Sequence, residues 1–241
     1  MPYILSPIIN ENMPGLWLEG SPYQKESIYS IAGKGPPVNY DKHIFKPHSL
    51  PHMESAAHTI EGGRKISDYY KKEDYSPFSG KCLLLKLQKP KWKKLEQNKL
   101  YHYEVSLEDL RKNIQRVNTS ATDIQRIIIS TDSFPGDNGT EHSPDNILTL
   151  STQAAEFLVS QIGFTMYGTS WKSSDFQPNS KNRPIHNILF KKAAVFECLK
   201  VHHIPEGYYF WSAFPIPVAD ASESVVCPVL YTLQELQALC W

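Results

Sequence analysis

The sequence predicts an α/β fold in which helices pack on a β-sheet. Three buried strands are expected at residues 81–87, 124–130 and 164–167, where apolar and β-branched residues run together. Two helices are expected between them, one after Ser106 and one after Ser151. This alternation of strand and helix typically produces a sheet covered by helices. Since no repeat or low-complexity linker interrupts the chain, residues 1–241 are expected to form one domain.

The elements follow from local patterns. Residues 1–47 contain seven prolines and predict short strands and turns rather than helices. Ser106 is a good N-cap, because acids follow in the first turn and Leu110 and Ile114 recur at helical spacing. Ser151 similarly begins a helix with one apolar stripe, which Gly163 ends.

Five lysines lie between Lys89 and Lys99, with Trp92 among them. Basic and aromatic residues of this kind can bind nucleic acid, but nothing else in the chain extends the patch. The segment is therefore expected to be a solvated loop.

Composition excludes several classes of protein. Lys plus Arg and Asp plus Glu number 25 each, so net charge favours neither a nucleic acid nor an anionic membrane as partner. No signal peptide is expected, because the first residues lack a basic segment followed by a long apolar one, and the printed sequence has no apolar run of about 20 residues. The cysteines form no C-x2-C pair, and Cys82 and Cys198 lie in apolar stretches where reduced core thiols are expected. A cytoplasmic protein is the expectation.

The most informative stretch is H-S-L-P-H-M-E-S-A-A-H, which places His48, His52, Glu54 and His58 at spacings of four, two and four. Imidazole and carboxylate groups are preferred ligands of Zn²⁺ and related metals. In a straight strand His48 and His52 would lie about 13 Å apart, too far to share an ion. The segment must therefore bend, and Pro51 is the expected place. The alternative is a histidine-rich surface loop without metal.

This stretch resembles the H-x-G-T-H-x-D-x-P-x-H signature of the cyclase family of metal-dependent hydrolases, which includes bacterial kynurenine formamidase and isatin hydrolase. All three histidines match, and Glu54 replaces the family's Asp with a residue of the same ligand chemistry. Leu50, Pro51 and Ala56 replace the family's Gly, Thr and Pro.

Further segments extend the resemblance over nearly the whole chain. His186 and Glu197 match a later His and Glu of the family, although their spacing is one residue shorter than usual. Residues 168–175 resemble the family's G-[IV]-D-x-x-S-x-D stretch, with Ser170 in place of an Asp and Asp175 matched. Asp175 is expected to cap a loop. Residues 205–215 resemble the family's P-x-G-x-Y-x-x-x-A-x-P strand.

The resemblance implies a mixed sheet of the swivelling β/β/α type with flanking helices, and a site that holds one or two divalent ions, Zn or Mn. His48, His52 and Glu54 would hold the first ion, and Glu54 would bridge to a second ion held by His186 and Glu197. His58 is the candidate general acid/base. The activity implied is arylformamidase-like hydrolysis of a small aryl amide or cyclic amide by a metal-activated water.

The resemblance also implies a small-molecule substrate and a homodimer or homotetramer. The N-terminal segment would help to form the pocket wall, for which Trp17, Tyr23 and Tyr29 are candidates. His43 and His102 lie outside the motif and are expected at the surface.

Two alternatives remain open. The same scaffold could catalyse a cyclase, dehydratase or lactone hydrolase reaction in a biosynthetic pathway. The chain could also be a non-catalytic metal-binding descendant that binds a small molecule or a protein. A panel of N-formyl aryl amines, cyclic imides and lactones separates the first alternative from the amidase, and binding without turnover would indicate the second.

Overall fold

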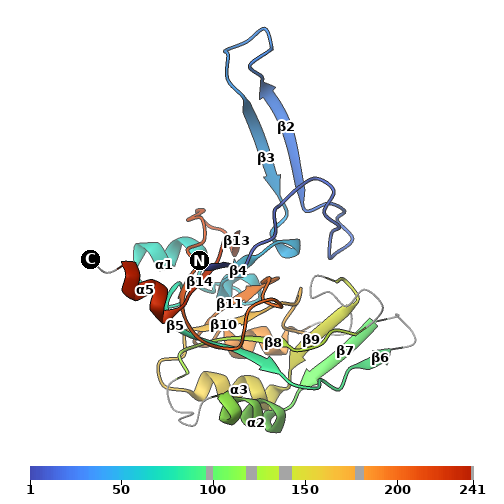
Figure 1. Ribbon diagram of the computed structural model, residues 1–241, viewed down its shortest axis with the longest axis vertical. Coiled ribbons are helices and arrows are strands. Elements are labelled where there is room, and N and C mark those ends of the chain that lie inside the picture. The colour runs from blue at the N-terminus through green and yellow to red at the C-terminus, as the bar shows by residue number, and fades with distance from the viewer. Residues whose placement is uncertain (96–99, 118–123, 136–142, 177–181, 240–241) are drawn as a thin grey trace.

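The fold is described from a computed structural model, which describes residues 1–95, 100–117, 124–135, 143–176 and 182–239 (Figure 1). A nine-stranded mixed sheet forms its centre. In spatial order its strands are β1 (Tyr3–Ile4), β14 (Val229–Tyr231), β12 (Gly207–Ser212), β5 (Ser79–Leu87), β8 (Arg126–Thr131), β10 (Met166–Thr169), β11 (Ala194–Glu197), β4 (His52–Glu54) and β13 (Glu223–Val225). Strands β5, β8, β10 and β11 pair in parallel, and the outer strands pair antiparallel. The α/β fold with a mixed sheet is confirmed.

Alternation along the central strands creates two apolar layers, because successive strand residues point to opposite faces. Leu83, Leu85 and Ile127 pack on one face, while Leu84 and Ile128 pack on the other. The three strands expected from the sequence thus form β5, β8 and β10, buried on both faces as parallel strands require.

Helices α2 (Leu107–Val117), α3 (Thr152–Ser160) and α4 (Pro184–Leu189) cover the face that contains Leu83. The two expected caps are present, since the hydroxyl groups of Ser106 and Ser151 accept hydrogen bonds from the backbone N–H groups of Asp109 and Ala154. Helix α1 (Ile66–Lys71) packs on the opposite face through Ile66 and Tyr69. Helix α5 (Leu233–Leu239) follows β14 at the far edge of the sheet (Figure 1).

A second sheet joins β6 (Lys93–Leu95), β7 (Leu100–Val105) and β9 (Asn146–Leu150). The lysine-rich segment is therefore not entirely a loop, because β6 pairs with β7 as an edge strand whose lysines remain exposed. Residues 96–99 of that segment lie outside the described residues. His102 on β7 is half-buried rather than at the surface, and its Nε2 lies 2.9 Å from the hydroxyl oxygen of Thr149.

Residues 1–47 form short strands and turns, as predicted, and most of their regular structure is one hairpin. Strands β2 (Tyr23–Tyr29) and β3 (Tyr40–Phe45) pair antiparallel and project away from the body of the molecule (Figure 1). Nearly every residue of this hairpin is exposed, including His43.

Cys82 and Cys198 are buried free thiols, as predicted, and Cys227 is an exposed free thiol. In the parts of the chain that the structure describes, none of the helices has the length and apolar character needed to cross a membrane.

Candidate metal centre

The first ligand segment bends through a 3-10 turn, η1 (Pro47–Ser49), before entering β4 at His52. Pro47 begins this turn, so the bend precedes Pro51 rather than occurring at it. Leu50 is extended, as expected for a residue before proline. A second 3-10 turn, η2 (Ala56–His58), then returns His58 toward the strand.

Strand β4 orients the central carboxylate. Met53 packs in the apolar layer on one side of the sheet, so His52 and Glu54 point to the other side. Oε1 of Glu54 lies 3.2 Å from Nδ1 of His48, 3.3 Å from Nε2 of His52 and 3.3 Å from Nε2 of His58. Three imidazoles thus converge on one oxygen of a buried carboxylate.

The second ligand segment approaches the other oxygen of Glu54. Nε2 of His186, on α4, lies 2.9 Å from Oε2 of Glu54 and 3.4 Å from Oε1 of Glu197. Glu197 is the last residue of β11, and it pairs across the sheet with His52. The cluster therefore lies at the carboxyl end of a parallel strand, where ligand sites of α/β sheets commonly occur.

The shorter spacing between His186 and Glu197 does not separate them. His186 lies on a helix that ends at Leu189, and Glu197 on a strand that begins at Ala194. Nε2 of His186 lies 3.4 Å from Oε1 of Glu197, so the two side chains meet despite the shorter spacing.

Hydrogen bonds fix the rings of two histidines. Nδ1 of His52 donates to the carbonyl oxygen of Leu50 at 2.8 Å, and Nδ1 of His186 donates to Oδ2 of Asp175 at 2.5 Å. In the neutral ring, each bond leaves Nε2 as the nitrogen with the lone pair, and in both residues Nε2 faces Glu54. Histidine ligands of metals are typically oriented by such carbonyl and carboxylate partners.

Burial and charge oppose each other at this cluster. Burial alone would raise the pKa of Glu54, but the charge and hydrogen bond of His186, with hydrogen bonds from His48 and His52, hold it well below its ordinary value. Burial would likewise lower the pKa of His186, but Glu54 and Asp175 raise it well above that value. Glu54 is thus a carboxylate at neutral pH, the form that binds metal.

The donor set fits a divalent ion. His48, His52 and Glu54 place ligand atoms within 4.8 Å of one another, and so do Glu54, His186 and Glu197. Oε2 of Glu54 and Nε2 of His186 are buried and lie 2.9 Å from each other, and neither atom has another hydrogen-bond partner among the described residues. Buried polar atoms without such partners are expected where an ion binds.

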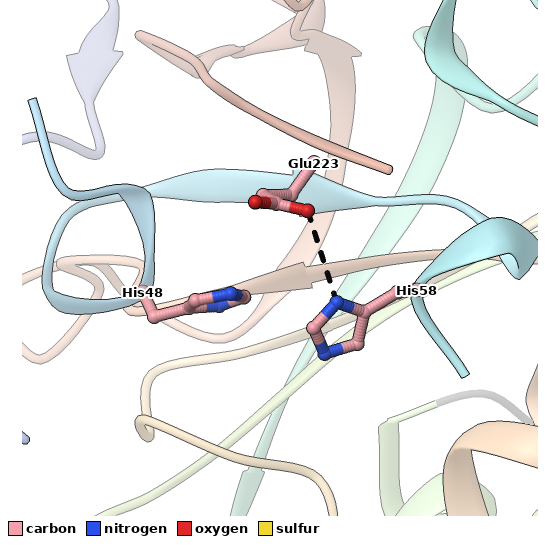
Figure 2. A group of neighbouring side chains, drawn as sticks. All are labelled: His48, His58 and Glu223. Carbon is pink, nitrogen blue, oxygen red and sulfur yellow. Dashed lines mark ion pairs between the residues drawn. The ribbon is translucent and has the colours of Figure 1, made fainter. Parts of the chain in front are cut away.

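The structure brings together all six residues named from the sequence. It also adds residues that the motif did not reveal. Glu223 on β13 lies directly opposite Glu54 across the sheet. Nδ1 of His58 lies 3.8 Å from Oε2 of Glu223, and His48 approaches the same group (Figure 2). His58 holds the pKa of Glu223 at about 2 against the effect of burial, with help from the Ser222 hydroxyl.

Asp175 and Ser174 support the second ligand set. Asp175 accepts hydrogen bonds from the backbone N–H groups of Ile185 and His186, so it caps α4 as well as orienting the His186 ring. The backbone N–H and the hydroxyl of Ser174 both donate to Oε1 of Glu197, at 2.6 and 2.5 Å. Asp175 was expected to cap a loop, whereas it caps helix α4 and contacts the His186 ring.

A cavity of about 470 Å³ opens over the cluster. Its wall includes site residues, an aromatic group and several charged side chains: Trp17, Glu19, Phe45, Lys46, Pro47, His48, Glu54, His58, Lys172, Ser173, Arg183, His186 and Glu197. Trp17 therefore lines the cavity as expected. Tyr23 and Tyr29, on strand β2 of the projecting hairpin, do not line it.

Known proteins resemble this chain over nearly its full length. Kynurenine formamidase of Bacillus anthracis is 24% identical over 216 residues, which cover 89% of this chain and 90% of that protein. Isatin hydrolase A from Ralstonia solanacearum superposes with a TM-score of 0.72 at 15% identity, covering 95% of this chain and 91% of that chain. A structure described as a potential metal-dependent hydrolase with cyclase activity has a TM-score of 0.66 at 16% identity, covering 95% and 96%. No protein-family model matches the chain.

The fold is that of the cyclase-type metal-dependent hydrolases, so the resemblance seen in the sequence is confirmed. Within that class, the sequence is similar to kynurenine formamidases.

Proposed function

We propose that this protein is a metal-dependent amidohydrolase that cleaves a small aryl amide or cyclic amide. The observation that carries the proposal is one buried carboxylate, Glu54, shared by two ligand sets beneath a single cavity. Similarity to proteins named kynurenine formamidase and isatin hydrolase supports this substrate class.

His48, His52 and Glu54 would hold one ion, and Glu54, His186 and Glu197 a second. When bound, a divalent ion supplies Lewis acidity, which lowers the pKa of a water molecule toward neutrality and polarises a carbonyl group. Zn²⁺ and Mn²⁺ both suit this mixture of imidazole and carboxylate.

His58 is the proposed general acid/base. Amide hydrolysis forms a C–O bond from water and breaks the C–N bond, so one proton must move from the water to the leaving nitrogen. His58 lines the cavity with its ring between two carboxylates, Nε2 facing Glu54 and Nδ1 facing Glu223. It can therefore accept the proton from the water and return it to the nitrogen.

Metal content tests the site before any substrate is known. The parent protein, purified without added metal, is expected to contain one or two ions per chain by elemental analysis. His52→Ala should lose at least the ion that His48, His52 and Glu54 would hold while retaining its fold by circular dichroism, and His43→Ala on the exposed hairpin serves as the matched control. Full metal occupancy in His52→Ala would contradict the proposed ligand set.

A different reaction on the same scaffold is the second candidate, since one structure with this fold is described as a novel cyclase. Metal-loaded protein should be assayed with N-formyl aryl amines, cyclic imides and lactones. Turnover of lactones alone would favour the second candidate. Binding without turnover at any metal loading would favour a non-catalytic descendant.

We also propose that the chain forms a homo-oligomer through its β2–β3 hairpin. A two-stranded hairpin is marginally stable alone in water. This one exposes several apolar side chains, which are Ile28, Tyr29, Tyr40, Ile44 and Phe45. A second copy would cover them, and it would border the cavity where Phe45 lines it.

Light scattering tests this assembly. The parent should have the mass of a dimer or tetramer, and Ile44→Lys should shift it toward the monomer. Ile162→Lys is the control, because Ile162 is exposed elsewhere on the molecule. A monomeric parent, or an unchanged mass in Ile44→Lys, would contradict the assembly.

A further inference from the structure

The wall of the cavity carries an excess of positive charge outside the metal centre. Lys46, Lys172 and Arg183 line it, and Glu19 is the single acid in the lining apart from Glu54 and Glu197. The latter two face the histidines of the metal centre and would be neutralised by the ions they hold. The remainder of the described lining is therefore cationic.

Lys172 contacts both a backbone carbonyl group and an aromatic ring. It is half-buried, its Nζ donates to the carbonyl oxygen of Leu16 at 3.1 Å, and the same nitrogen lies 4.7 Å from the centroid of the Trp17 ring. Among the described residues it forms no ion pair, since Glu19 instead accepts a hydrogen bond from the Ser49 hydroxyl at 2.7 Å. Arg183 approaches Ser173 and Lys46 donates to the main-chain oxygen of Glu19.

A partly buried ammonium group with only neutral partners is costly. Burial accordingly lowers the pKa of Lys172 below its ordinary value, and only weaker effects of nearby acidic groups oppose this. An anion in the cavity would offset the cost, because an ammonium group has three N–H donors and the bond to Leu16 uses one. The Trp17 ring beside it offers an apolar surface for the body of the same ligand.

We propose that Lys172 is a specificity-determining residue that binds a carboxylate carried by the substrate, at a distance from the amide that is cleaved. The prediction that such a substrate is hydrolysed rests on the proposed amidohydrolase function, whereas the prediction that Lys172 binds a carboxylate does not. The substrate class is thereby narrowed to aryl amides that bear a carboxylate.

Binding of a matched pair of product-like compounds tests the proposal without turnover. The pair is 4-aminobenzoate and 4-aminobenzamide, which have similar size and differ in charge. Titration calorimetry on metal-loaded protein should show a preference for the carboxylate of about 10-fold or more, the range expected for one charge-assisted hydrogen bond. The preference should decrease as salt is added.

Three variants test whether Lys172 causes the preference for the carboxylate over the carboxamide. Lys172→Met should reduce the affinity ratio of carboxylate to carboxamide about 10-fold, whereas Lys172→Arg should largely keep it. Lys81→Met is the matched control, because Lys81 also lies over an aromatic ring, that of Tyr208, but outside the cavity. Its ratio should equal that of the parent.

Different results would contradict the role of Lys172 and the amidohydrolase function. A ratio near one in the parent, or an unchanged ratio in Lys172→Met, overturns the role of Lys172 even if formylated aryl amines are hydrolysed. Absence of hydrolysis of 4-formamidobenzoate and its carboxamide counts against the amidohydrolase. In that case a ratio that depends on Lys172 still establishes the carboxylate subsite.

Discussion

Asp175 accepts a 2.5 Å hydrogen bond from Nδ1 of His186, and the opposite nitrogen of the same ring lies 2.9 Å from Glu54. Asp175→Asn is expected to lower metal affinity about 10- to 100-fold, because an amide neither fixes the ring tautomer nor raises the basicity of the imidazole as a carboxylate does. Titration calorimetry with Zn²⁺ measures the change.

The control is Asp132→Asn, since Asp132 accepts from a backbone N–H in an exposed turn away from the cavity. Equal affinity in the parent and Asp175→Asn would show that Asp175 only caps α4.

Removal of the His58 ring should separate catalysis from metal binding. His58→Gln is expected to keep its metal and to lose about 10²- to 10⁴-fold in kcat, the usual contribution of a general acid/base. Elemental analysis and steady-state kinetics on the same preparation measure both. Loss of an ion from His58→Gln would instead make His58 a ligand, within the group that it forms with His48 and Glu223.

Glu223→Gln tests how His58 is held. Glu54 and Glu223 face each other across the β4–β13 pair, and His58 interacts with both carboxylates. The neutral amide should reduce kcat less than His58→Gln does, with metal content unchanged. A larger loss than in His58→Gln would indicate that Glu223 acts on the substrate directly.

His102 should make the protein less stable in mild acid. Burial, with a smaller effect of Lys93, lowers the pKa of its ring from 6.5 to about 4. Above pH 6.5 the ring is neutral in both folded and unfolded chains, so it has no effect there. Between pH 6.5 and 4 only the unfolded chain takes up the proton, so stability falls as the pH falls.

His102→Gln removes this dependence. After allowance for solvent screening of a half-buried group, the parent should lose about 1 kcal/mol more than the variant between pH 7 and 5. Urea denaturation at the two pH values measures the difference. Parallel losses in both proteins would contradict the shift.

Gly80 should not tolerate a side chain. Its φ is +133°, and a Cβ there would lie 2.6 Å from Nη1 of Arg126, which is buried. Gly80→Ala is expected to cost about 2 kcal/mol or more of unfolding free energy. Gly207→Ala is the matched control, because its φ is +148° but a Cβ would meet no atom within 4 Å. A larger loss in Gly207→Ala would show that backbone conformation, not crowding by Arg126, dominates.

Much of the fold could be predicted because its determinants are local. Ser106 and Ser151 cap their helices as the sequence indicates, and the run of isoleucines at 127–129 is buried on both faces. The position of the projecting hairpin was harder to predict, because its sequence indicates strands and turns but not whether they pack against the body of the molecule. The resemblance to the family suggested Tyr23 and Tyr29 as residues of the pocket wall, but neither lines the cavity.

The candidate site also contains some residues that the sequence could predict and others that it could not. His48, His52, Glu54 and His58 lie within eleven residues, so their spacing alone suggested a cluster. Glu223 could not be found in this manner, because its position follows from the register of two strands that are distant in sequence. The contacts of Lys172 could not be predicted from the sequence either, because Trp17 and Leu16 approach it only in the folded chain.

Strand β4 has consequences for how the protein is made. Its two neighbours in the sheet, β11 and β13, both come from the last quarter of the sequence. A nascent chain would therefore carry His48, His52 and His58 long before any strand is available to pair with β4. The sheet around β4 would then be complete only after synthesis of β13, and a stop between residues 198 and 222 would remove that strand while leaving all six proposed functional residues in place.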